Sequence, residues 1–567
     1  MSAQGGLSRQ NSLTLGELQL PPIFSRRGFW LLLAGMMIGW SVWQADLFGQ
    51  DLVNQGGWEL VRRFLAAGLH PAFSREFLLL TLEAALATLA YAGAATFLFT
   101  IIASIGGVLA SEVWWQTLFR SGRGGRLHDR APWTIVRSLL AFPRAVHEVI
   151  WGLFFINVLG LDPLTAILAI AIPFGAIGAK VFSEILDETE RRPVNALLNS
   201  GAPPLVAFIY GLIPPALPDL LSYTFYRFEC GIRAAAVLGL IGAGGLGYQI
   251  LLSMQTLRYE EMWTLLIALI ILSGLSDLWS SAVRNRLGKA NNLRRGAPII
   301  VWSLAAALGL TVFSFWYLAP DVAALFEPAT MERLNYIASA SFPPSLGVIS
   351  LQTMLNLSAR TFAMSVLAMT GAGILAIIFS FLGARNFALK LGSAGGPARK
   401  SPLGYFLLLA TRLAFLVGRA VPPPVWALLF LFVLFPGVLP AAMALGLYNW
   451  GVAGRLMAES VENMDERPLN ALRAQGAPGT HSFLYGALPV TLPSAIGYIL
   501  YRWEVCIRAT VIVGLVGAGG LGRLISEQLS SFNYDGVLAS LLFLVELTLM
   551  VDLLSAVVRT NLRAVAT

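Results

Sequence analysis

Three charged residues lie deep within a strongly apolar stretch of the first half of the chain. Arg227, Glu229 and Arg233 follow Pro218 in the segment 217–242. Glu229 and Arg233 are four residues apart, so a helix places them on one face, in the favourable order for an ion pair. Counting about 1.5 Å per residue from Pro218 places both roughly 16–22 Å into a bilayer core about 30 Å thick. Charges at that depth should face a bundle interior or a water-filled cavity.

The same set of residues occurs a second time, 275 positions later. Tyr226, Arg227, Glu229 and Arg233 are matched by Tyr501, Arg502, Glu504 and Arg508. Two roles fit: ion pairs, Glu229 with Arg233 and Glu504 with Arg508, that lock helices, and a positive lining that admits an anion. Arg227 and Arg502 have no acidic residue three or four positions away, so we predict that they are the free charges on an anion pathway. Arg144 and Arg419, in matching RAV segments, complete this candidate pathway.

These residues belong to an internal duplication. Residues 184–247 contain RPVNALLNSGAP, GLIPPALP, YRFECGIRAA and LGLIGAGGLG, and residues 459–522 contain RPLNALRAQGAP, GALPVTLP, YRWEVCIRAT and VGLVGAGGLG. The register holds without a gap across both segments. Nearer the N-terminus the offset becomes 273, as for Thr88 and Thr361. The chain therefore consists of two related halves.

The composition is that of a membrane protein. Hydrophobic residues make up 56% of the 567 residues and charged residues 12%, with a mean hydropathy of +0.70. A soluble protein carries about 25% charged residues, and runs close to the ~20 apolar residues that cross a bilayer recur throughout this chain. The net charge of +8 fits an excess of Lys and Arg in cytoplasmic loops, so we expect no nucleic-acid partner.

The hydropathy pattern predicts an all-α membrane protein with about twelve transmembrane helices in two parallel six-helix repeats. The spans are expected near residues 29–48, 77–110, 133–160, 164–182, 217–242, 262–284, 299–319, 351–383, 403–435, 438–457, 492–517 and 538–559. Basic loops place both termini in the cytoplasm. The predicted domains are a cytoplasmic tail at 1–28, a first repeat at 29–284, a basic cytoplasmic linker at 285–298 and a second repeat at 299–567. A pathway should run between parallel repeats.

A short polar segment occurs at matching positions on the cytoplasmic side of each half. An Arg-Pro pair suits a helix start, because proline is tolerated in the first turn, and a Gly-Ala-Pro sequence suits its end. Two such copies predict a pair of docking elements for a two-fold symmetric cytoplasmic partner. The candidate docking residues are Glu184, Arg192, Pro193, Asn195, Gly201 and Pro214, with Glu459, Arg467, Pro468, Asn470, Gly476 and Pro489 in the second half.

A glycine-rich GAGGLG run closes the fifth span of each half. It is not a dinucleotide-binding fingerprint, because no alternating strand and helix unit surrounds it. A hinge or close backbone packing is the better interpretation. The glycines concerned are Gly242, Gly244, Gly245, Gly247, Gly517, Gly519, Gly520 and Gly522.

Several chemistries are excluded or disfavoured. Gly288-Lys289-Ala290 lacks the spacing and the hydroxyl of a phosphate-binding loop, so we expect no ATP hydrolysis and no cofactor in this chain itself. Cys230 and Cys506 are too few for a disulfide framework or a cysteine metal site. His147 and Glu148 could bind a metal or relay protons, but the four histidines are scattered. We therefore expect no metal site.

At the docking segments the sequence resembles a known family. A glycine followed thirteen residues later by a proline, within NALxxxGAP…LPxxLP, is similar to the coupling loop of type I ABC importer permeases. That loop, the EAA motif, inserts into a cleft of the ATPase subunit. The runs YRFECGIRAAAVLGLIGAGGLG and YRWEVCIRATVIVGLVGAGGLG resemble the phosphonate-uptake permease family (PhnE type), which also serves phosphite importers. The resemblance covers roughly residues 77–285 and 351–560.

The resemblance implies the translocation subunit of an ATP-driven importer for phosphonate, phosphite or a related small oxyanion. It implies two cytoplasmic ABC ATPase subunits that hold ATP and Mg, an external substrate-binding protein, and a place in the lipid bilayer of the bacterial cytoplasmic membrane. Most family members are single copies that pair as homodimers, whereas this chain carries both copies. Asn195 and Asn470 stand where the motif has a glutamate, and RAVPPPVW replaces RAVHEVIW in the second half, so the halves need not contribute equally.

Two other classes of transport protein share features with this sequence. A secondary transporter of the major facilitator type is also built from two parallel six-helix halves, and SGRGGRLHDR has some likeness to its acidic–basic loop. That segment has no counterpart in the second half, which counts against this alternative. An ion channel would need a selectivity filter, and none is recognisable. The leading interpretation is therefore the ABC importer subunit.

Overall fold

The computed structural model describes residues 26–46, 53–119, 126–287, 293–389, 402–478 and 481–566. Within these residues the fold is all α-helical, apart from an isolated antiparallel bridge between Val53 and Leu434. The described residues do not include the first 25 residues of the predicted tail at 1–28. They also do not include the centre of the predicted linker, residues 288–292.

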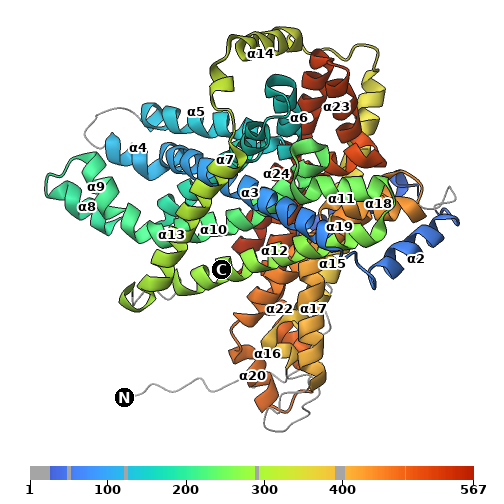
Figure 1. Ribbon diagram of the computed structural model, residues 1–567. Helices are drawn as coiled ribbons and strands as arrows, with labels where there is room; N and C mark the ends of the chain where they lie inside the picture. Colours follow the sequence, from blue (N-terminus) through green and yellow to red (C-terminus); the bar gives the residue numbers. More distant parts are fainter. Residues whose placement is uncertain are drawn as a thin grey trace, which may run out of the picture.

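Each half supplies a full set of helices (Figure 1). The first half comprises α1 (Arg26–Gln44), α2 (Gly57–Ala67), α3 (Arg75–Ala110), α4 (Glu112–Leu118), α5 (Arg126–Ala145), α6 (Glu148–Leu159), α7 (Pro163–Glu188), α8 (Arg192–Asn199), α9 (Pro204–Gly211), α10 (Ile213–Leu238), the π-helical turn η1 (Gly239–Ala243), α11 (Gly245–Gln255) and α12 (Tyr259–Leu287). The second half comprises α13 (Leu293–Leu318), η3 (Ala323–Phe326), α14 (Pro328–Ser341), α15 (Leu351–Gly383), α16 (Arg385–Ala388), α17 (Pro402–Ala420), α18 (Pro423–Val433), α19 (Val438–Glu462), α20 (Arg467–Ala474), η4 (Ser482–Ala487), α22 (Leu488–Val513), η5 (Gly514–Ala518), α23 (Gly520–Ser530) and α24 (Tyr534–Ala566).

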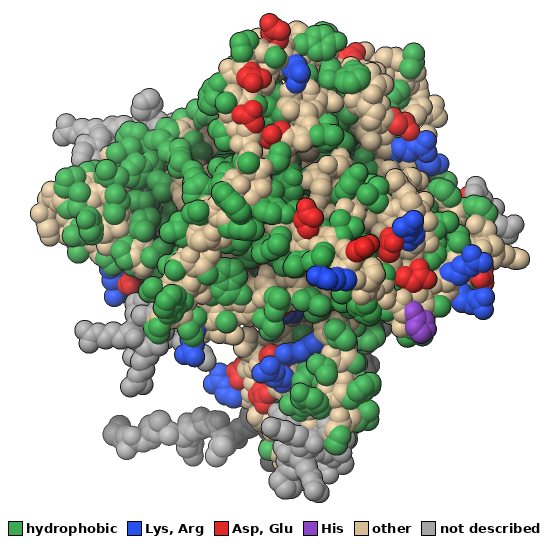
Figure 2. All heavy atoms as spheres, viewed as in Figure 1, with side chains coloured by type: hydrophobic (Ala, Val, Ile, Leu, Met, Phe, Trp, Pro, Cys, Tyr) green, Lys and Arg blue, Asp and Glu red, His purple; other side chains and the backbone are tan. Residues whose placement is uncertain are grey.

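The helices confirm the predicted fold class. Within the described residues, eight helices are long and apolar enough to cross a membrane, or ten if each of two bent helix pairs is one span. α1 and α19 occupy the two other predicted spans. Hydrophobic side chains cover much of the visible face in Figure 2, as expected for a surface in contact with lipid.

Two predicted spans, 133–160 and 403–435, are broken rather than continuous. α5 and α6 meet at 86°, and α17 gives way to α18 at the matching place. The residues that precede α6 and α18 are His147 and Pro422, and both have extended backbones, with ψ of 148° and 144°. Proline cannot continue a helix, and His147 Nδ1 caps α6 by accepting a hydrogen bond from Val149 N at 3.4 Å. Two different sequences therefore build the same break.

The two halves interlock through their first helices. α1 of the first half packs on α15 of the second, and α13 packs on α3. The close approach of α13 to α3 requires a small residue on α3, because a Cβ on Gly93 would lie 2.5 Å from Ser314 Oγ. α2 of the first half packs on α18 of the second, and α14 of the second half packs on α6 of the first, where Arg333 Nη1 donates to the Val158 carbonyl at 3.0 Å. The largest apolar core cluster accordingly contains residues of both halves.

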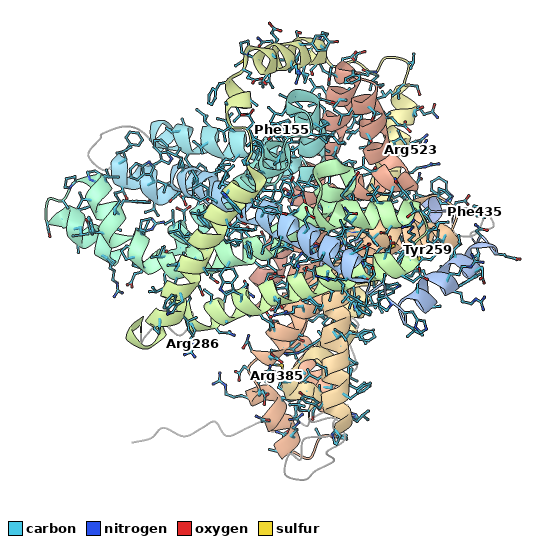
Figure 3. The ribbon with its side chains drawn as sticks, in the orientation of Figure 1. Phe155, Tyr259, Arg286, Arg385, Phe435 and Arg523 are labelled. Carbon is cyan, nitrogen blue, oxygen red and sulfur yellow. The ribbon has the colours of Figure 1, made fainter. Side chains whose placement is uncertain are left out.

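The fold has two distinct sides. α8 with α9 at the left and α20 at the bottom of Figure 1 lie on one side, opposite α14 at the top and α2 at the right. Arg286 near the end of α12 and Arg385 at the start of α16 point to the first side, and Arg523 of α23 lies toward the second (Figure 3). Both predicted docking segments are thus on the same side of the bundle.

Candidate functional site

A cavity between the two halves is lined by arginines. Its volume is about 130 Å³. The lining arginines are three pairs related by the repeat, namely Arg144 with Arg419, Arg227 with Arg502 and Arg233 with Arg508. Tyr226 and Tyr501 also line it. Of the ten predicted pathway residues, the cavity brings together eight, and only Glu229 and Glu504 are not in its lining.

The charge of the lining is strongly positive. The only carboxylate among the described lining residues is Glu148, whose Oε2 lies 3.0 Å from His147 Nδ1. A cavity with such an excess of cationic groups concentrates anions. In the described part of the chain, no group of three or more His, Cys, Asp and Glu side chains is placed to hold a metal ion.

Arg227 and Arg502 have no carboxylate partner within the described structure. The Arg227 guanidinium lies 4.4 Å from the centroid of the Phe174 ring, and its Nε is buried without a hydrogen-bond partner there. Arg502 donates from Nε and Nη2 to Asn449 Oδ1 at 3.0 and 2.6 Å. An aromatic face and a neutral amide leave the positive charge of each side chain uncompensated. The prediction that neither has an acidic partner is confirmed, whereas their role in a pathway stays a prediction.

The break between α5 and α6 positions a third cavity arginine, Arg508. Its Nη1 donates to the carbonyl of Arg144, near the end of α5, at 2.7 Å, and its Nε donates to the carbonyl of Glu504 at 3.0 Å. Carbonyls at a helix C-terminus lack intrahelical partners and attract cations. The predicted side-chain pair of Glu504 with Arg508 is therefore wrong. The Glu504 carboxylate instead lies 2.6 Å from Arg559 Nη1.

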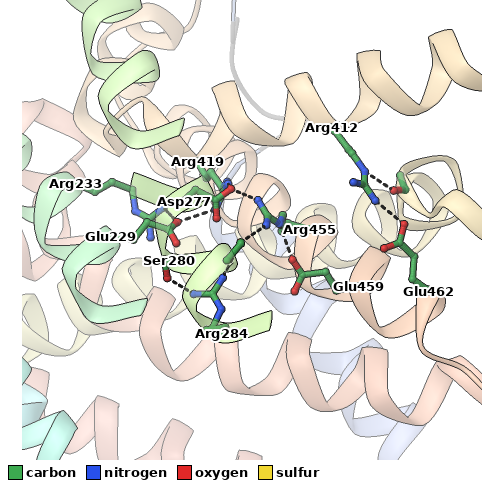
Figure 4. Close-up of polar contacts among 12 residues, drawn as sticks. Glu229, Arg233, Asp277, Ser280, Arg284, Arg412, Arg419, Arg455, Glu459 and Glu462 are labelled. Atoms are coloured by element: carbon green, nitrogen blue, oxygen red, sulfur yellow. Dashed lines mark hydrogen bonds and ion pairs between the residues drawn. The ribbon is translucent and has the colours of Figure 1, made fainter. Parts of the chain in front are cut away.

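Glu229, in contrast, binds two arginines, one from each half. Arg233 Nη1 and Arg419 Nη1 donate to Glu229 Oε1 at 3.0 and 2.8 Å, which confirms the predicted pair of Glu229 with Arg233. Arg419 Nη2 also donates to Asp277 Oδ2 at 2.8 Å, and Asp277 is bonded in turn to Arg455 of α19 (Figure 4). Arg455 is partly buried and the other groups are buried, so the network joins α10 and α12 to α17 and α19 inside the bundle.

Loss of Glu229 should destabilise the fold more than loss of Arg233. Glu229→Gln deprives two buried arginines of a carboxylate, whereas Arg233→Met leaves Glu229 bonded to Arg419. Breaking a buried ion pair typically costs about 3–5 kcal/mol. We expect thermal unfolding of the purified chain in detergent to show the greater loss for Glu229→Gln. Equal losses would mean that Arg419 gains nothing from Glu229.

The two docking segments form matched short helices, α8 and α20. Each begins at the predicted Arg-Pro pair, and each is followed by a glycine with positive φ, 84° at Gly201 and 80° at Gly476. Ala202 N donates to the Leu197 carbonyl at 3.0 Å, and the equivalent bond at α20 is 3.1 Å. This is the Schellman ending, which needs a left-handed residue and favours glycine.

Each docking helix has one buried residue and an exposed outer face. Val194 and Leu469 are buried against the bundle, and the next residues, Asn195 and Asn470, are exposed. Beside α20, Arg467 donates to Asp465 at 2.8 Å, and this hydrogen bond lowers the pKa of the Asp465 carboxyl. The other predicted docking residues flank these helices: Glu184 and Glu459 in the last turns of α7 and α19, and Pro214 and Pro489 in the first turns of α10 and α22.

Carboxylates missed in the sequence analysis fix the ends of α7 and α19, the helices that precede α8 and α20 in the chain. Asp187, at the end of α7, accepts from Arg137 Nη2 at 3.3 Å and also caps the start of α4. Glu462, at the end of α19, accepts from Arg412 and from the Arg385 amide, the latter at 2.7 Å. Asp187 and Glu462 are 275 positions apart, and so are Arg137 and Arg412. The repeat offset is the signal that could have identified them.

The glycine runs reverse the chain after the fifth span. Positive φ angles occur at Gly242, Gly244, Gly245, Gly517, Gly519 and Gly520. α11 then packs back on α10, and a Cβ on Gly247 or Gly522 would collide with a carbonyl of the preceding helix. Thr88 Oγ1 and Thr361 Oγ1 each accept a hydrogen bond at 2.9 Å from an amide at the start of α11 or α23. The geometry is that of close backbone packing, and hinge motion stays a prediction.

Comparison with known proteins defines the class. Residues 121–290 and 401–564 each match the family of the binding-protein-dependent transport system inner membrane component. The chain belongs to this family, and it carries the permease domain twice. This confirms the duplication and the permease class expected from the docking segments.

Two individual permeases are similar to this chain. The chain is 28% identical over 471 residues to the phosphate-import permease protein PhnE of Mycolicibacterium smegmatis, which covers 82% of this chain and 84% of that one. It is 28% identical over 264 residues to the phosphite transport system permease protein PtxC of Stutzerimonas stutzeri, or 46% of this chain and 88% of the relative. No solved structure matches the chain significantly.

Proposed function

We propose that the chain is the translocation subunit of an ATP-driven importer for phosphonate, phosphite or a related small oxyanion. The observation that carries the proposal is the arginine-lined cavity between the halves. Arg227 and Arg502, from opposite halves, offer charges that no carboxylate in the described structure neutralises. A small oxyanion with two negative charges suits such a pair, because charge-assisted hydrogen bonds to guanidinium groups are strong and directional.

The same proposal assigns the partners. α8 and α20 each dock one ABC ATPase subunit, and ATP and Mg reside in those two subunits, because this chain has no phosphate-binding loop motif and is not an enzyme. The exposed outer faces of both helices, on one side of the bundle, support this assignment (Figure 1). That side and both termini face the cytoplasm, and the side of α2 and α14 receives the substrate-binding protein.

Membership of a binding-protein-dependent family favours this function over a major facilitator transporter. The paired docking helices favour it too, because a secondary transporter has no ATPase for them to bind. The two functions also differ in their energy source. An importer of this class needs ATP, whereas a secondary transporter needs an ion gradient.

Reconstitution separates the two functions. The chain is placed in proteoliposomes with its ATPase, and labelled phosphonate or phosphite is supplied with the binding protein on the opposite face. We expect uptake only when ATP is present on the docking side. Uptake that follows a proton or sodium gradient and ignores the ATPase would contradict the proposal.

A mild change at the docking surface tests whether shape or side-chain bonding holds the ATPase. Asn195→Ala with Asn470→Ala removes both exposed amides and leaves the helix ends intact. One hydrogen bond contributes about 0.5–1.5 kcal/mol net, so transport should fall only partly and the ATPase should still co-purify. Complete loss of co-purification would show that the asparagine side chains dominate docking.

A further inference from the structure

We infer that the two docking helices are coupled unequally to the cavity: Asp277 and Arg455 connect it to the α20 side, and no matching connection reaches the α8 side. The inference rests on the proposed function and adds an asymmetry between the halves. Asp277 and Arg455 are positioning residues, since they do not line the cavity and act through Arg419, which does.

On the α20 side the charged groups form an unbroken series (Figure 4). Arg419 lines the cavity and donates to Asp277 Oδ2 at 2.8 Å. Asp277 is bonded to Arg455, and Arg455 Nε donates to Glu459 Oε1 at 2.8 Å. Glu459 lies in the last turn of α19, directly before the loop that leads into α20. The series therefore extends from the cavity wall to the last turn of α19, the helix that precedes one docking helix.

On the α8 side the matching series has longer contacts and is interrupted between Asp552 and Lys180. Asp552, the counterpart of Asp277, is 4.0 Å from Arg144, and its Oδ1 is buried without a hydrogen-bond partner in the described structure. Lys180 stands at the position of Arg455, and its Nζ lies 3.9 Å from Glu184. An ammonium group lacks the planar fork with which arginine holds two acceptors at once. No hydrogen bond or ion pair within the described residues joins Lys180 to Asp552.

An anion in the cavity would act on this series directly. It competes with Glu229 and Asp277 for Arg419, because all three present oxygen acceptors to one guanidinium group. When the Arg419 guanidinium bonds to the anion, Asp277 keeps only its ion pair with Arg455. The balance of charge among Asp277, Arg455 and Glu459 then changes. On the α8 side the series is interrupted between Asp552 and Lys180, so the change is not transmitted in the same way.

The matched substitutions Asp277→Asn and Asp552→Asn test the asymmetry, since each removes one charge at the same place in its half. The full chain is assembled with its ATPase, and ATP hydrolysis is measured with binding protein supplied with methylphosphonate, phosphite or phosphate. Coupling between sites is typically worth fivefold or more, so Asp277→Asn should lower the ratio of stimulated to basal hydrolysis about tenfold and Asp552→Asn less than about twofold. Equal effects of the two variants would overturn the inference.

A second readout needs no oxyanion. Amide hydrogen exchange of the purified chain should rise at α20 but not at α8 in Asp277→Asn, and Asp552→Asn should produce no such one-sided change. Arg455→Lys, which copies the residue of the other half, should reproduce the effect if Asp277→Asn folds poorly. Exchange that rises equally at both helices would refute the asymmetry. Absence of stimulation in the unaltered complex would instead count against the proposed function.

Discussion

Replacing Gly201 and Gly476 together with valine should abolish substrate-stimulated ATP hydrolysis by the assembled complex. Both glycines have positive φ, 84° and 80°, and a β-branched residue is strongly disfavoured there. A Cβ at either position would have no atom within 4 Å, so the effect comes from backbone conformation and not from crowding. The last turn of each docking helix would have to rearrange, at a cost of about 1–3 kcal/mol per site. The membrane helices should be unaffected.

A matched control lies one residue earlier in each helix. Ser200 and Gln475 have ordinary negative φ angles of −84° and −81°, so Ser200→Val with Gln475→Val adds the same side chains without the strain. We expect this variant to keep most of the stimulated hydrolysis, whereas the glycine variant keeps none although it inserts normally. Full stimulation in the glycine variant would show that α8 and α20 are not the docking elements.

Neutralising Arg227 and Arg502 together should reduce oxyanion uptake about a hundredfold. A hydrogen bond to a charged group contributes about 1.5–3 kcal/mol, and about 1.4 kcal/mol corresponds to a factor of ten. Arg227→Gln with Arg502→Gln removes one such charge from each half. Neither arginine belongs to an ion pair in the described structure, so folding should suffer less than in variants of Glu229. Uptake into proteoliposomes and thermal unfolding together separate the two effects.

The lysine variants provide the control for this prediction. Arg227→Lys with Arg502→Lys keeps both charges but loses the planar fork, so we expect intermediate uptake. If the glutamine variant transports at the unaltered rate, these arginines do not lie on the anion route. If the lysine variant is as poor as the glutamine variant, geometry and not charge is the requirement.

The duplication made much of this architecture predictable from sequence. Gly201 and Gly476 recur with their helix-ending context, and both are at the ends of short helices, as expected. Local spacing offers Arg227 and Arg502 no acidic partner within their own helices, and in the described structure Arg227 lies on Phe174 and Arg502 bonds to Asn449. The local sequence pattern and the offset of the repeat therefore predict the positions of the helices and of many candidate residues.

Long-range contacts could not be derived in this way. Glu504 and Arg508 have the same four-residue spacing as Glu229 and Arg233, yet Arg508 turns to a carbonyl of Arg144. That carbonyl is available only because the third span breaks, and the two halves build this break with different residues, His147 and Pro422, so the repeat does not reveal it. The bond of Arg419 to Glu229 likewise joins residues of different halves, and no local period reports it.

The location of a bound oxyanion tests the central claim most directly, that the anion passes between the two halves through the arginine-lined cavity. The complex would be stalled with a phosphonate or phosphite and imaged by electron cryomicroscopy. We predict density for the anion within hydrogen-bonding distance of Arg227 and Arg502, with one arginine contributed by each half. An anion bound elsewhere, with these two side chains still on Phe174 and Asn449, would contradict the account.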